Sequence, residues 1–158
     1  MNKITPFLWF DNNAEEAIKF YTSLFKDSKI TSITKYPDSV PGMGGKVLNA
    51  MFELNGQQFM ALDGGPMYKF NESFSIYVNC EDQAEVDHLW NKLIADGGEE
   101  SQCGWLKDKY GLSWQIIPKA LGELMGNPDP EKANRVMQCM LKMKKIVVAD
   151  LEKAAEGK

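Results

Sequence analysis

The sequence predicts an α+β protein built from two β-α-β-β-β units and a helical C-terminal segment. Each half of the chain holds one amphipathic helical stretch among short apolar or alternating runs, in the same order. The segments 52–63 and 107–118 align without a gap at a shift of 55 residues, which supports an internal repeat. We expect one domain over residues 1–158, with units at 3–66 and 72–118 and a C-terminal helical extension at 119–156.

The first half begins with a strand and a helix. ITPFLWF (4–10) is a short apolar run rich in β-forming residues, which predicts a buried strand. Asn13 and Glu16 suit the N-cap and N3 positions of a helix whose apolar stripe is Ala17, Ile18, Tyr21, Leu24 and Phe25. Strands are then expected at 28–36, 46–54 and 57–63. The Asn55-Gly56 pair between the last two is the strongest short signal for a hairpin.

The second half repeats this order and adds helices. SFSIYVNC (73–80) predicts a strand, and a helix within 81–98 follows, with Asp82 at its N-cap. Further strands are expected in SQCGWLKD and GLSWQIIP. A short helix is predicted at 119–125, and Pro130 suits the first turn of a helix that runs to about Met143. The C-terminal residues predict an extended piece and one last short helix.

Composition and charge exclude several classes of protein. The 158 residues are 44% hydrophobic and 25% charged, which is typical of a soluble globular protein. The net charge of -4 argues against nucleic acid or an anionic membrane as a partner, since both require a basic face. Cys80, Cys103 and Cys139 form no CxxC pair, so neither a structural zinc site nor a disulfide framework is indicated. Without a signal-peptide core or an apolar run of roughly 20 residues, a cytoplasmic location is expected.

Gln115 stands out because a polar side chain lies between Trp114 and Ile116 in a predicted strand. It could ligate a metal ion, hydrogen-bond a ligand in a pocket, or face solvent. Trp9, Trp105 and Trp114 either line such a pocket as flat apolar walls or pack in the core. Strand alternation places Trp114 and Gln115 on opposite faces, so they cannot both face one pocket unless a bulge intervenes.

The remaining candidates each have an ordinary alternative. Asp63 either accepts a hydrogen bond at a pocket rim or caps the turn at Gly64-Gly65. Cys103 could be a nucleophile, but no nearby residue supplies a base, which favours an inert thiol. His88 lies off the apolar stripe of its helix, which favours a solvated position over a general base. GMGG (42–45) precedes a predicted strand, whereas a nucleotide-binding glycine loop follows a strand and opens a helix.

Three stretches resemble a known family, namely FELNGQQFMALDGG, CGWLKDKYGLSWQIIP and RVMQCMLKMKKI. Together with the paired units they resemble the PhnB-like branch of the vicinal oxygen chelate superfamily, which includes glyoxalase, bleomycin-resistance and dioxygenase proteins. Members of this branch often carry the label "3-demethylubiquinone-9 3-methyltransferase domain". The resemblance covers residues from about 3 to 152. It implies a curved eight-stranded mixed sheet around a pocket and, in many members, a homodimer.

The resemblance also implies where a metal ion would be held. In metal-dependent members, His, Gln or Glu ligands lie on the first and last strands of each unit, near Pro6, Met60, Ser75 and Gln115 of this chain. Proline offers no side-chain donor, and a thioether suits copper(I) better than zinc, nickel or iron. A useful divalent site requires about three protein ligands. We therefore expect no metal ion and no other cofactor.

The leading hypothesis is a homodimeric, metal-free domain that binds a small, partly apolar molecule in the cup of the sheet. The candidate ligand-binding residues are Trp9, Asp63, Cys103, Trp105, Trp114 and Gln115, and no catalytic residue is assigned. Two enzymatic alternatives stay open: a metal-dependent lyase, isomerase or dioxygenase of glyoxalase type, and the methyltransferase of the family label. The chain has no strand–glycine-rich loop–helix element for S-adenosylmethionine, which weakens the second alternative.

Overall fold

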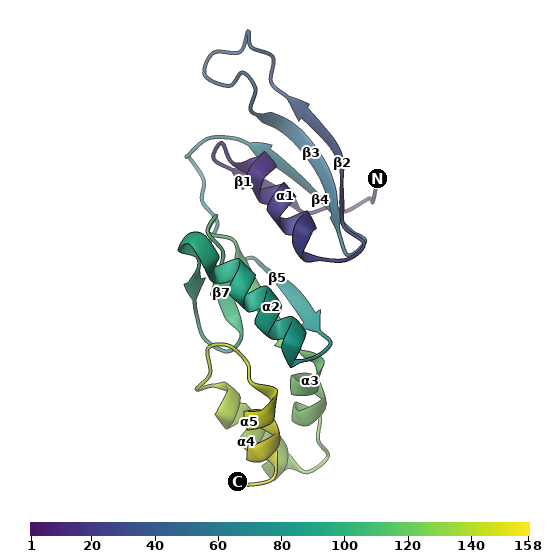
Figure 1. Cartoon of the computed structure of the whole chain (residues 1–158), viewed down its shortest axis with the longest axis vertical. Coiled ribbons are helices and arrows are strands. Elements are labelled where there is room, and N and C mark those ends of the chain that lie inside the picture. The colour runs from purple at the N-terminus through teal and green to yellow at the C-terminus, as the bar shows by residue number, and fades with distance from the viewer. The chain divides into compact units, whose positions relative to one another are not determined.

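The computed structural model describes residues 1–158 as two compact units, Met1–Lys69 and Phe70–Lys158. Each unit contains a four-stranded mixed sheet with one long helix across a face of that sheet (Figure 1). The second unit also contains the C-terminal helices. None of the helices combines the length and hydropathy that crossing a membrane requires.

The first unit has the order β-α-β-β-β. Its elements are β1 Phe7–Phe10, α1 Ala14–Leu24, β2 Lys29–Lys35, β3 Val47–Leu54 and β4 Gln57–Asp63. The strand order in the sheet is β1-β4-β3-β2, with β1 parallel to β4 and the other pairs antiparallel. Asn55 and Gly56 both have positive φ, as the predicted two-residue hairpin between β3 and β4 requires.

One face of the first sheet and one stripe of α1 form the core of this unit. Alternate strand residues point to opposite faces, so one face collects the buried side chains. On the sheet these are Leu8, Phe10, Ala50, Phe52, Phe59 and Ala61, and on α1 they are Ala14, Ala17, Ile18 and Tyr21. Burial of each large side chain contributes about 1.5–3 kcal/mol. The opposite face of the sheet keeps half-exposed side chains.

The second unit repeats the first. Its elements are β5 Ser75–Cys80, α2 Gln83–Ile94, β6 Glu99–Glu100, β7 Trp105–Lys107 and β8 Ser113–Pro118, with a 3-10 turn η1 at Ala95–Gly97. The strand order β5-β8-β7-β6 matches the order in the first sheet, and β5 runs parallel to β8. Val86, Leu89, Trp90 and Leu93 of α2 are buried, as the predicted apolar stripe indicates.

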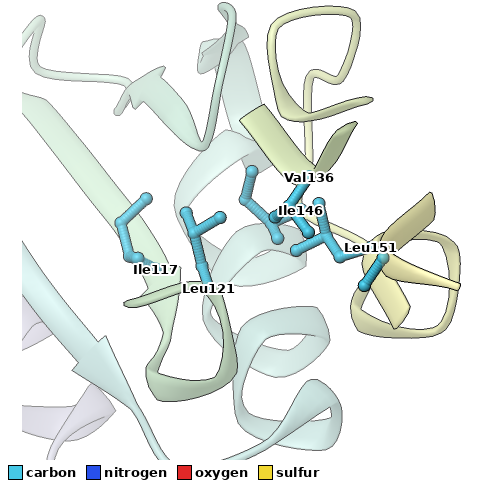
Figure 2. Close-up of a cluster of buried hydrophobic side chains, with 6 residues drawn as sticks. Ile117, Leu121, Val136, Ile146 and Leu151 are labelled. Atoms are coloured by element: carbon cyan, nitrogen blue, oxygen red, sulfur yellow. The ribbon is translucent and has the colours of Figure 1, made fainter. Parts of the chain in front are cut away.

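The C-terminal extension consists of three helices, α3 Lys119–Met125, α4 Pro130–Met140 and α5 Val148–Ala155. They surround a hydrophobic cluster made of Ile117, Leu121, Val136, Ile146, Leu151 and Ala155 (Figure 2). Helix α4 ends three residues before the predicted Met143. Beyond Met140 the hydrogen bonds tighten to i→i−3, from Lys142 to Cys139 at 3.2 Å and from Met143 to Met140 at 2.9 Å. The segment that follows is held by the Cys103 and Gly104 amides, which donate to the Met143 and Lys144 carbonyls at 2.8 Å.

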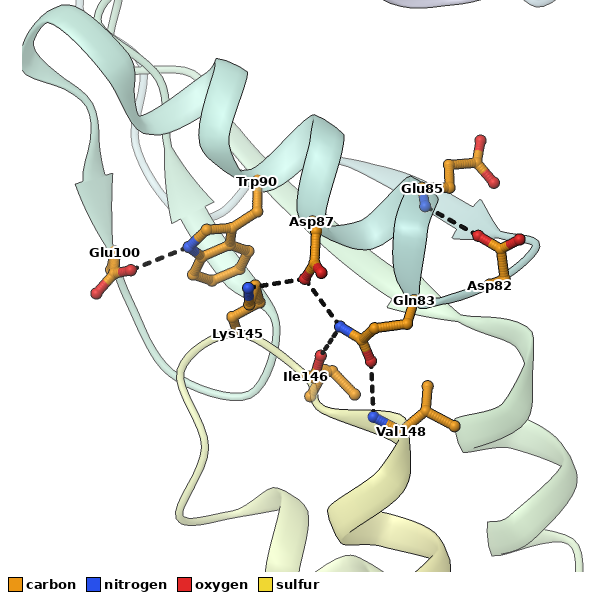
Figure 3. Close-up of polar contacts among 9 residues, drawn as sticks. All are labelled: Asp82, Gln83, Glu85, Asp87, Trp90, Glu100, Lys145, Ile146 and Val148. Atoms are coloured by element: carbon orange, nitrogen blue, oxygen red, sulfur yellow. Dashed lines mark hydrogen bonds and ion pairs between the residues drawn. The ribbon is translucent and has the colours of Figure 1, made fainter.

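Polar contacts attach the extension to the start of α2 (Figure 3). The Gln83 side chain donates to the Ile146 carbonyl at 3.0 Å and accepts from the Val148 amide at 2.8 Å. Asp87 pairs with Lys145 at 2.7 Å and also accepts from Gln83 at 3.0 Å. The segment between α4 and α5 is therefore held by specific hydrogen bonds as well as by apolar packing.

The predicted fold class is confirmed: two β-α-β-β-β units are followed by C-terminal helices. The eight strands form two hydrogen-bonded sheets of four. The strand register also refines the repeat, because Phe7 pairs with Met60 and Tyr77 pairs with Gln115. Phe7 and Tyr77 are 70 residues apart, one more than the 69-residue shift that aligns IKFY (18–21) of α1 with DHLW (87–90) of α2. The proposed boundaries of a single domain stay a prediction.

Candidate functional site

The face of the second sheet opposite α2 gathers most of the chemistry that the sequence offers. We call it the second open face. Strand alternation and register assign to it Ser75, Tyr77, Asn79, Trp105, Lys107, Ser113, Gln115 and Ile117. The side chains on the other face, including Trp114 and Leu106, are buried against α2. The second open face is thus the surface of this unit that keeps polar and aromatic groups together.

Gln115 lies between two aromatic residues on this face. Its Cα position is paired with Tyr77 on β5 and with Trp105 on β7, so the three side chains form one row across the sheet. Tyr77 is 57% exposed and Trp105 is half-buried. The Gln115 side chain donates through Nε2 to Ser75 Oγ at 2.9 Å, which leaves its Oε1 as an acceptor. An amide flanked by flat apolar walls is a common arrangement in small-molecule sites.

A second, more polar row lies next to the first. Ser113 is paired with Ser75 on β5 and with Lys107 on β7. Ser113 is 1% exposed, and its Oγ is buried without a hydrogen-bond partner. A buried hydroxyl without a partner costs about 1–3 kcal/mol, and such a group in a native structure calls for an explanation such as a water or ligand atom. The unpaired Ser113 Oγ is therefore the group on this face that calls for a water or ligand atom.

Trp114 lies on the face covered by α2, as strand alternation predicted. It is fully buried, and its Nε1 donates to Asp108 Oδ2 at 2.9 Å. Asp108 Oδ1 also accepts from the amides of Tyr110 and Leu112, at 2.8 and 3.1 Å. Trp114 is thus a core residue held by a buried carboxylate, and it takes no part in the row around Gln115.

Trp9 belongs to the corresponding open face of the first sheet, which also includes Phe7, Met51, Met60 and Leu62. The Trp9 ring is half-buried, and its Nε1 donates to the Gly65 carbonyl at 2.9 Å. A Cβ at Gly64 would lie 2.2 Å from the ring, so the ring packs directly on glycine backbone. Tyr68 meets Trp9 edge-on, with ring centroids 5.1 Å apart. Trp9 is therefore a fixed apolar wall on its own sheet.

Asp63 is a structural acceptor inside the first unit. It is 3% exposed, its Oδ1 accepts from the Ala14 amide at 2.9 Å, and its Oδ2 accepts from the Val47 amide at 2.9 Å. The sequence suggested a cap for the Gly64-Gly65 turn as the ordinary role of this residue. That detail is wrong, because both carboxylate oxygens join the start of α1 and the start of β3 to the end of β4.

The thiols and the histidine offer little chemistry. Cys103 is half-buried at a left-handed turn position, φ 56°, where its amide bonds to the extension. Burial, with a smaller contribution from Glu85, raises the pKa of the buried Cys80 thiol to about 12, so it is protonated at neutral pH. His88 is exposed on α2. GMGG lies in the turns that precede β3, as expected of a hairpin loop.

The positions that correspond to metal ligands do not fit a divalent ion. Gln115 and Ser75 are adjacent, but both are neutral and they bond to each other. The strand registers make Thr5, rather than Pro6, the position in the first unit that is equivalent to Ser75. In the same way Met60 is equivalent to Gln115. No three His, Cys, Asp or Glu side chains lie close enough together to hold a metal ion. A neutral amide, hydroxyls and a thioether make a weak donor set for zinc, nickel or iron.

Among the residues of this face that sequence reasoning did not consider, Ser113 and Tyr77 matter most for the site. Both lie two positions from a residue that it did consider, Ser113 before Gln115 and Tyr77 after Ser75. The strand period of two residues places them on the same face. The unpaired state of the Ser113 hydroxyl, in contrast, depends on what surrounds it and has no sequence signal.

Comparison with known proteins identifies the family. The family described as 3-demethylubiquinone-9 3-methyltransferase matches residues 2–117. The PhnB protein from Bacillus cereus is 43% identical, with a TM-score of 0.70, over 74% of this chain and 99% of that chain. Protein PA1353 from Pseudomonas aeruginosa is 24% identical, with a TM-score of 0.61, over 75% of this chain and 98% of that one.

A glyoxalase/bleomycin resistance protein/dioxygenase domain from Frankia is 14% identical, with a TM-score of 0.49, over 75% of this chain and 92% of that one. No curated protein matches the chain. The family match ends at residue 117, so helices α3 to α5 lie outside it. The family resemblance predicted from the sequence is thus confirmed: the chain belongs to the 3-demethylubiquinone-9 3-methyltransferase family, and it is similar to the PhnB protein.

Proposed function

We propose that this protein binds a small, partly apolar molecule through the second open face and that binding requires no metal ion. The main observation in support of this proposal is the buried Ser113 Oγ, which has no partner and lies beside the row of Tyr77, Gln115 and Trp105. The two aromatic rings offer apolar surface, and the Gln115 amide offers an acceptor. This combination suits a planar or short aliphatic molecule with one or two polar groups.

The metal-free part of the proposal rests on the donor set. The side chains at the ligand positions are neutral, and the Gln115 amide is already engaged with Ser75. The metal-dependent lyase, isomerase or dioxygenase stays the principal alternative. The methyltransferase name belongs to the family, and the glycine-rich segment of this chain opens strand β3 rather than a helix.

Thermal-shift screening of the purified full chain with a library of small aromatic and carbonyl compounds, in the presence of EDTA, tests the proposal. Compounds that bind are expected to raise the melting temperature and to change tryptophan fluorescence, because Trp105 lies in the row. Gln115→Leu and Ser113→Ala should each weaken binding by about two- to tenfold, the loss of one hydrogen bond. Gln57→Leu, an exposed glutamine on β4, is the matched control and should bind as the parent does.

Two results would overturn the proposal. One is binding that EDTA abolishes, or a stoichiometric divalent metal in elemental analysis of the purified protein; either would favour the metal-dependent alternative. The other is binding that Gln115→Leu leaves unchanged. Assembly as a cytoplasmic homodimer is part of the same proposal, and light scattering should report twice the mass of one chain.

A further inference from the structure

The C-terminal extension carries a groove of its own, whose lining shares no residue with the second open face. It has a volume of about 550 Å³ and is lined only by residues of α4, α5 and the segments that follow them. This volume falls within the range of about 300–1,000 Å³ that small-molecule sites occupy. Since the family match ends at residue 117, nothing in the family relationship accounts for this groove.

Arg135 is the fixed cation of the groove. Its Nε donates to the Ala154 carbonyl at 2.9 Å and one of its terminal nitrogens, Nη2, donates to the Ala155 carbonyl at 2.6 Å. These bonds hold the guanidinium at the C-terminal end of α5, while Nη1 has no partner among the hydrogen bonds and ion pairs. Gly157 passes close to the guanidinium, and a Cβ there would lie 3.8 Å from Nε. The charge is therefore held in place before any ligand arrives.

The other charges of the groove are mainly positive. Lys142 is exposed and has no ion pair, and Lys158 pairs with Glu156 at 2.7 Å. Asp150 is the single acidic side chain in the lining. The extension as a whole, residues 119–158, contains eight Lys or Arg and six Asp or Glu, while residues 1–118 contain ten and sixteen. The lining of the groove thus holds three basic side chains and one acidic one, in contrast with the acidic remainder of the chain.

The groove also has an apolar part. Cys139, Met143 and Ala154 contribute to its lining, and Cys139 Sγ is already occupied by a weak contact to the Asp150 carbonyl at 3.7 Å. Cys139 and Met143 also pack against the cluster under the helices. A ligand here would contact sulfur and methyl groups on one side and the guanidinium on the other.

We propose that this groove binds a small molecule with a carboxylate or phosphate group and a short apolar or aromatic part. The anion pairs with the prepositioned Arg135 and with Lys142, and the apolar part lies on Met143 and Ala154. A planar guanidinium recognises both kinds of oxyanion through paired hydrogen bonds. This site is separate from the proposed ligand surface around Gln115 and does not depend on it.

An NMR titration of the full chain with phenyl phosphate, benzoate and neutral benzyl alcohol tests this proposal. Both anions should shift the Ala154 and Gly157 amides and the Arg135 Nε–H saturably, with a dissociation constant on the order of millimolar. Benzyl alcohol should not. Tighter binding of phenyl phosphate assigns the site to phosphate esters, and equal or tighter binding of benzoate assigns it to carboxylates.

Charge variants on α4 and after it make the test specific. Lys142→Gln should weaken binding of both anions by about threefold, as expected of a partly exposed charge. Lys132→Gln is the matched control, because Lys132 is an exposed lysine of α4 that does not line the groove. Arg135→Lys, which keeps the charge but loses the fork, should weaken binding more than Lys142→Gln. Absence of saturable shifts, equal shifts with benzyl alcohol, or equal weakening by Lys132→Gln would each overturn the proposal.

Discussion

The two units share one strand order but start their helices in different ways. Helix α1 has Asn13 at its N-cap without a side-chain hydrogen bond, and its first amide is bound instead by Asp63 at the end of β4. Helix α2 is capped by its own Asp82, which accepts from the Glu85 amide at 2.9 Å. The repeat position of Asp63 is Pro118, which has no carboxylate. At the start of α1 a backbone amide thus donates to a residue distant in the sequence. At the start of α2 the acceptor is the neighbouring N-cap residue.

The units also place their buried carboxylates at different positions of the repeat. Asp108 is buried and accepts from three donors around the β7–β8 turn. Its counterpart at a shift of 55 residues is Glu53, which is half-exposed and pairs with Lys29 at 3.6 Å. A repeated topology therefore does not require a repeated polar network, provided that each buried donor finds an acceptor.

The open faces of the two sheets differ in the side chains they carry and in whether the C-terminal extension packs on them. The first carries a row of Phe7, Met60 and Met51, where the second carries Tyr77, Gln115 and Trp105. Ile117 of the second face is 7% exposed because the extension packs on it, whereas its counterpart Leu62 is half-exposed. The two halves thus also diverge on the faces away from the long helices.

The largest expected effect comes from removing either buried carboxylate. Asp63→Ala and Asp108→Ala should each lower the free energy of unfolding by about 3 kcal/mol, because buried backbone or indole donors lose their acceptors. Urea denaturation measures this. Asp11→Ala, at an exposed residue of the first unit, should change it by less than about 0.5 kcal/mol. A small effect for Asp63→Ala alone would show that α1 needs no long-range acceptor, and the comparison of the units would fail.

Glycine substitutions should give effects of opposite sign. Gly64→Ala should cost about 2 kcal/mol, because the new Cβ would overlap the Trp9 ring and displace it. Gly122→Ala on α3 meets no atom within 4 Å and should stabilise the protein by up to about 1 kcal/mol. Thermal melts and the tryptophan emission spectrum measure both. An unchanged spectrum in Gly64→Ala would contradict the close packing of Trp9.

The two helix caps should differ by about 1 kcal/mol. Asp82→Ala removes a side-chain cap and should lower the free energy of unfolding by about 1 kcal/mol. Asn13→Ala removes no such bond and should have almost no effect. Chemical denaturation of the two variants in parallel measures both changes. Equal losses in the free energy of unfolding would refute the distinction between local and long-range capping.

The smallest effect concerns the attachment of the extension. The hydrogen bond from Lys145, followed by that from Gln83, holds the pKa of Asp87 below its usual value. A lowered folded-state pKa contributes stability above the unfolded value of about 4, and this stability is lost as pH falls through the folded-state pKa.

Because the Asp87 side chain is 44% exposed, the contribution should not exceed about 0.5 kcal/mol. Asp87→Asn should therefore destabilise slightly at neutral pH and have no effect at strongly acidic pH. Thermal melts across this range measure it, with Glu152→Gln as the exposed control. A loss that persists unchanged in acid would contradict the assignment.

The repeat, the helix stripes and the hairpin at Asn55-Gly56 were predictable because each depends on neighbours in sequence. So was the separation of Trp114 from Gln115, which follows from strand alternation alone. The attachment of the segment after α4 was not predictable, because the Met143 carbonyl accepts from Cys103, forty residues earlier in the chain. The role of Asp63 was missed for the same reason, since its two partners lie in other elements.

By itself, then, the sequence determined the periods of its apolar residues, its turns and its local caps, and from these the order of two similar units. Only the tertiary structure decided which buried donors and acceptors meet. It placed Gln115 between Tyr77 and Trp105, left Ser113 Oγ without a partner, and anchored Arg135 beside a groove. The physical reason is that hydrogen-bond satisfaction is a property of groups brought together across the chain, and no local pattern records it.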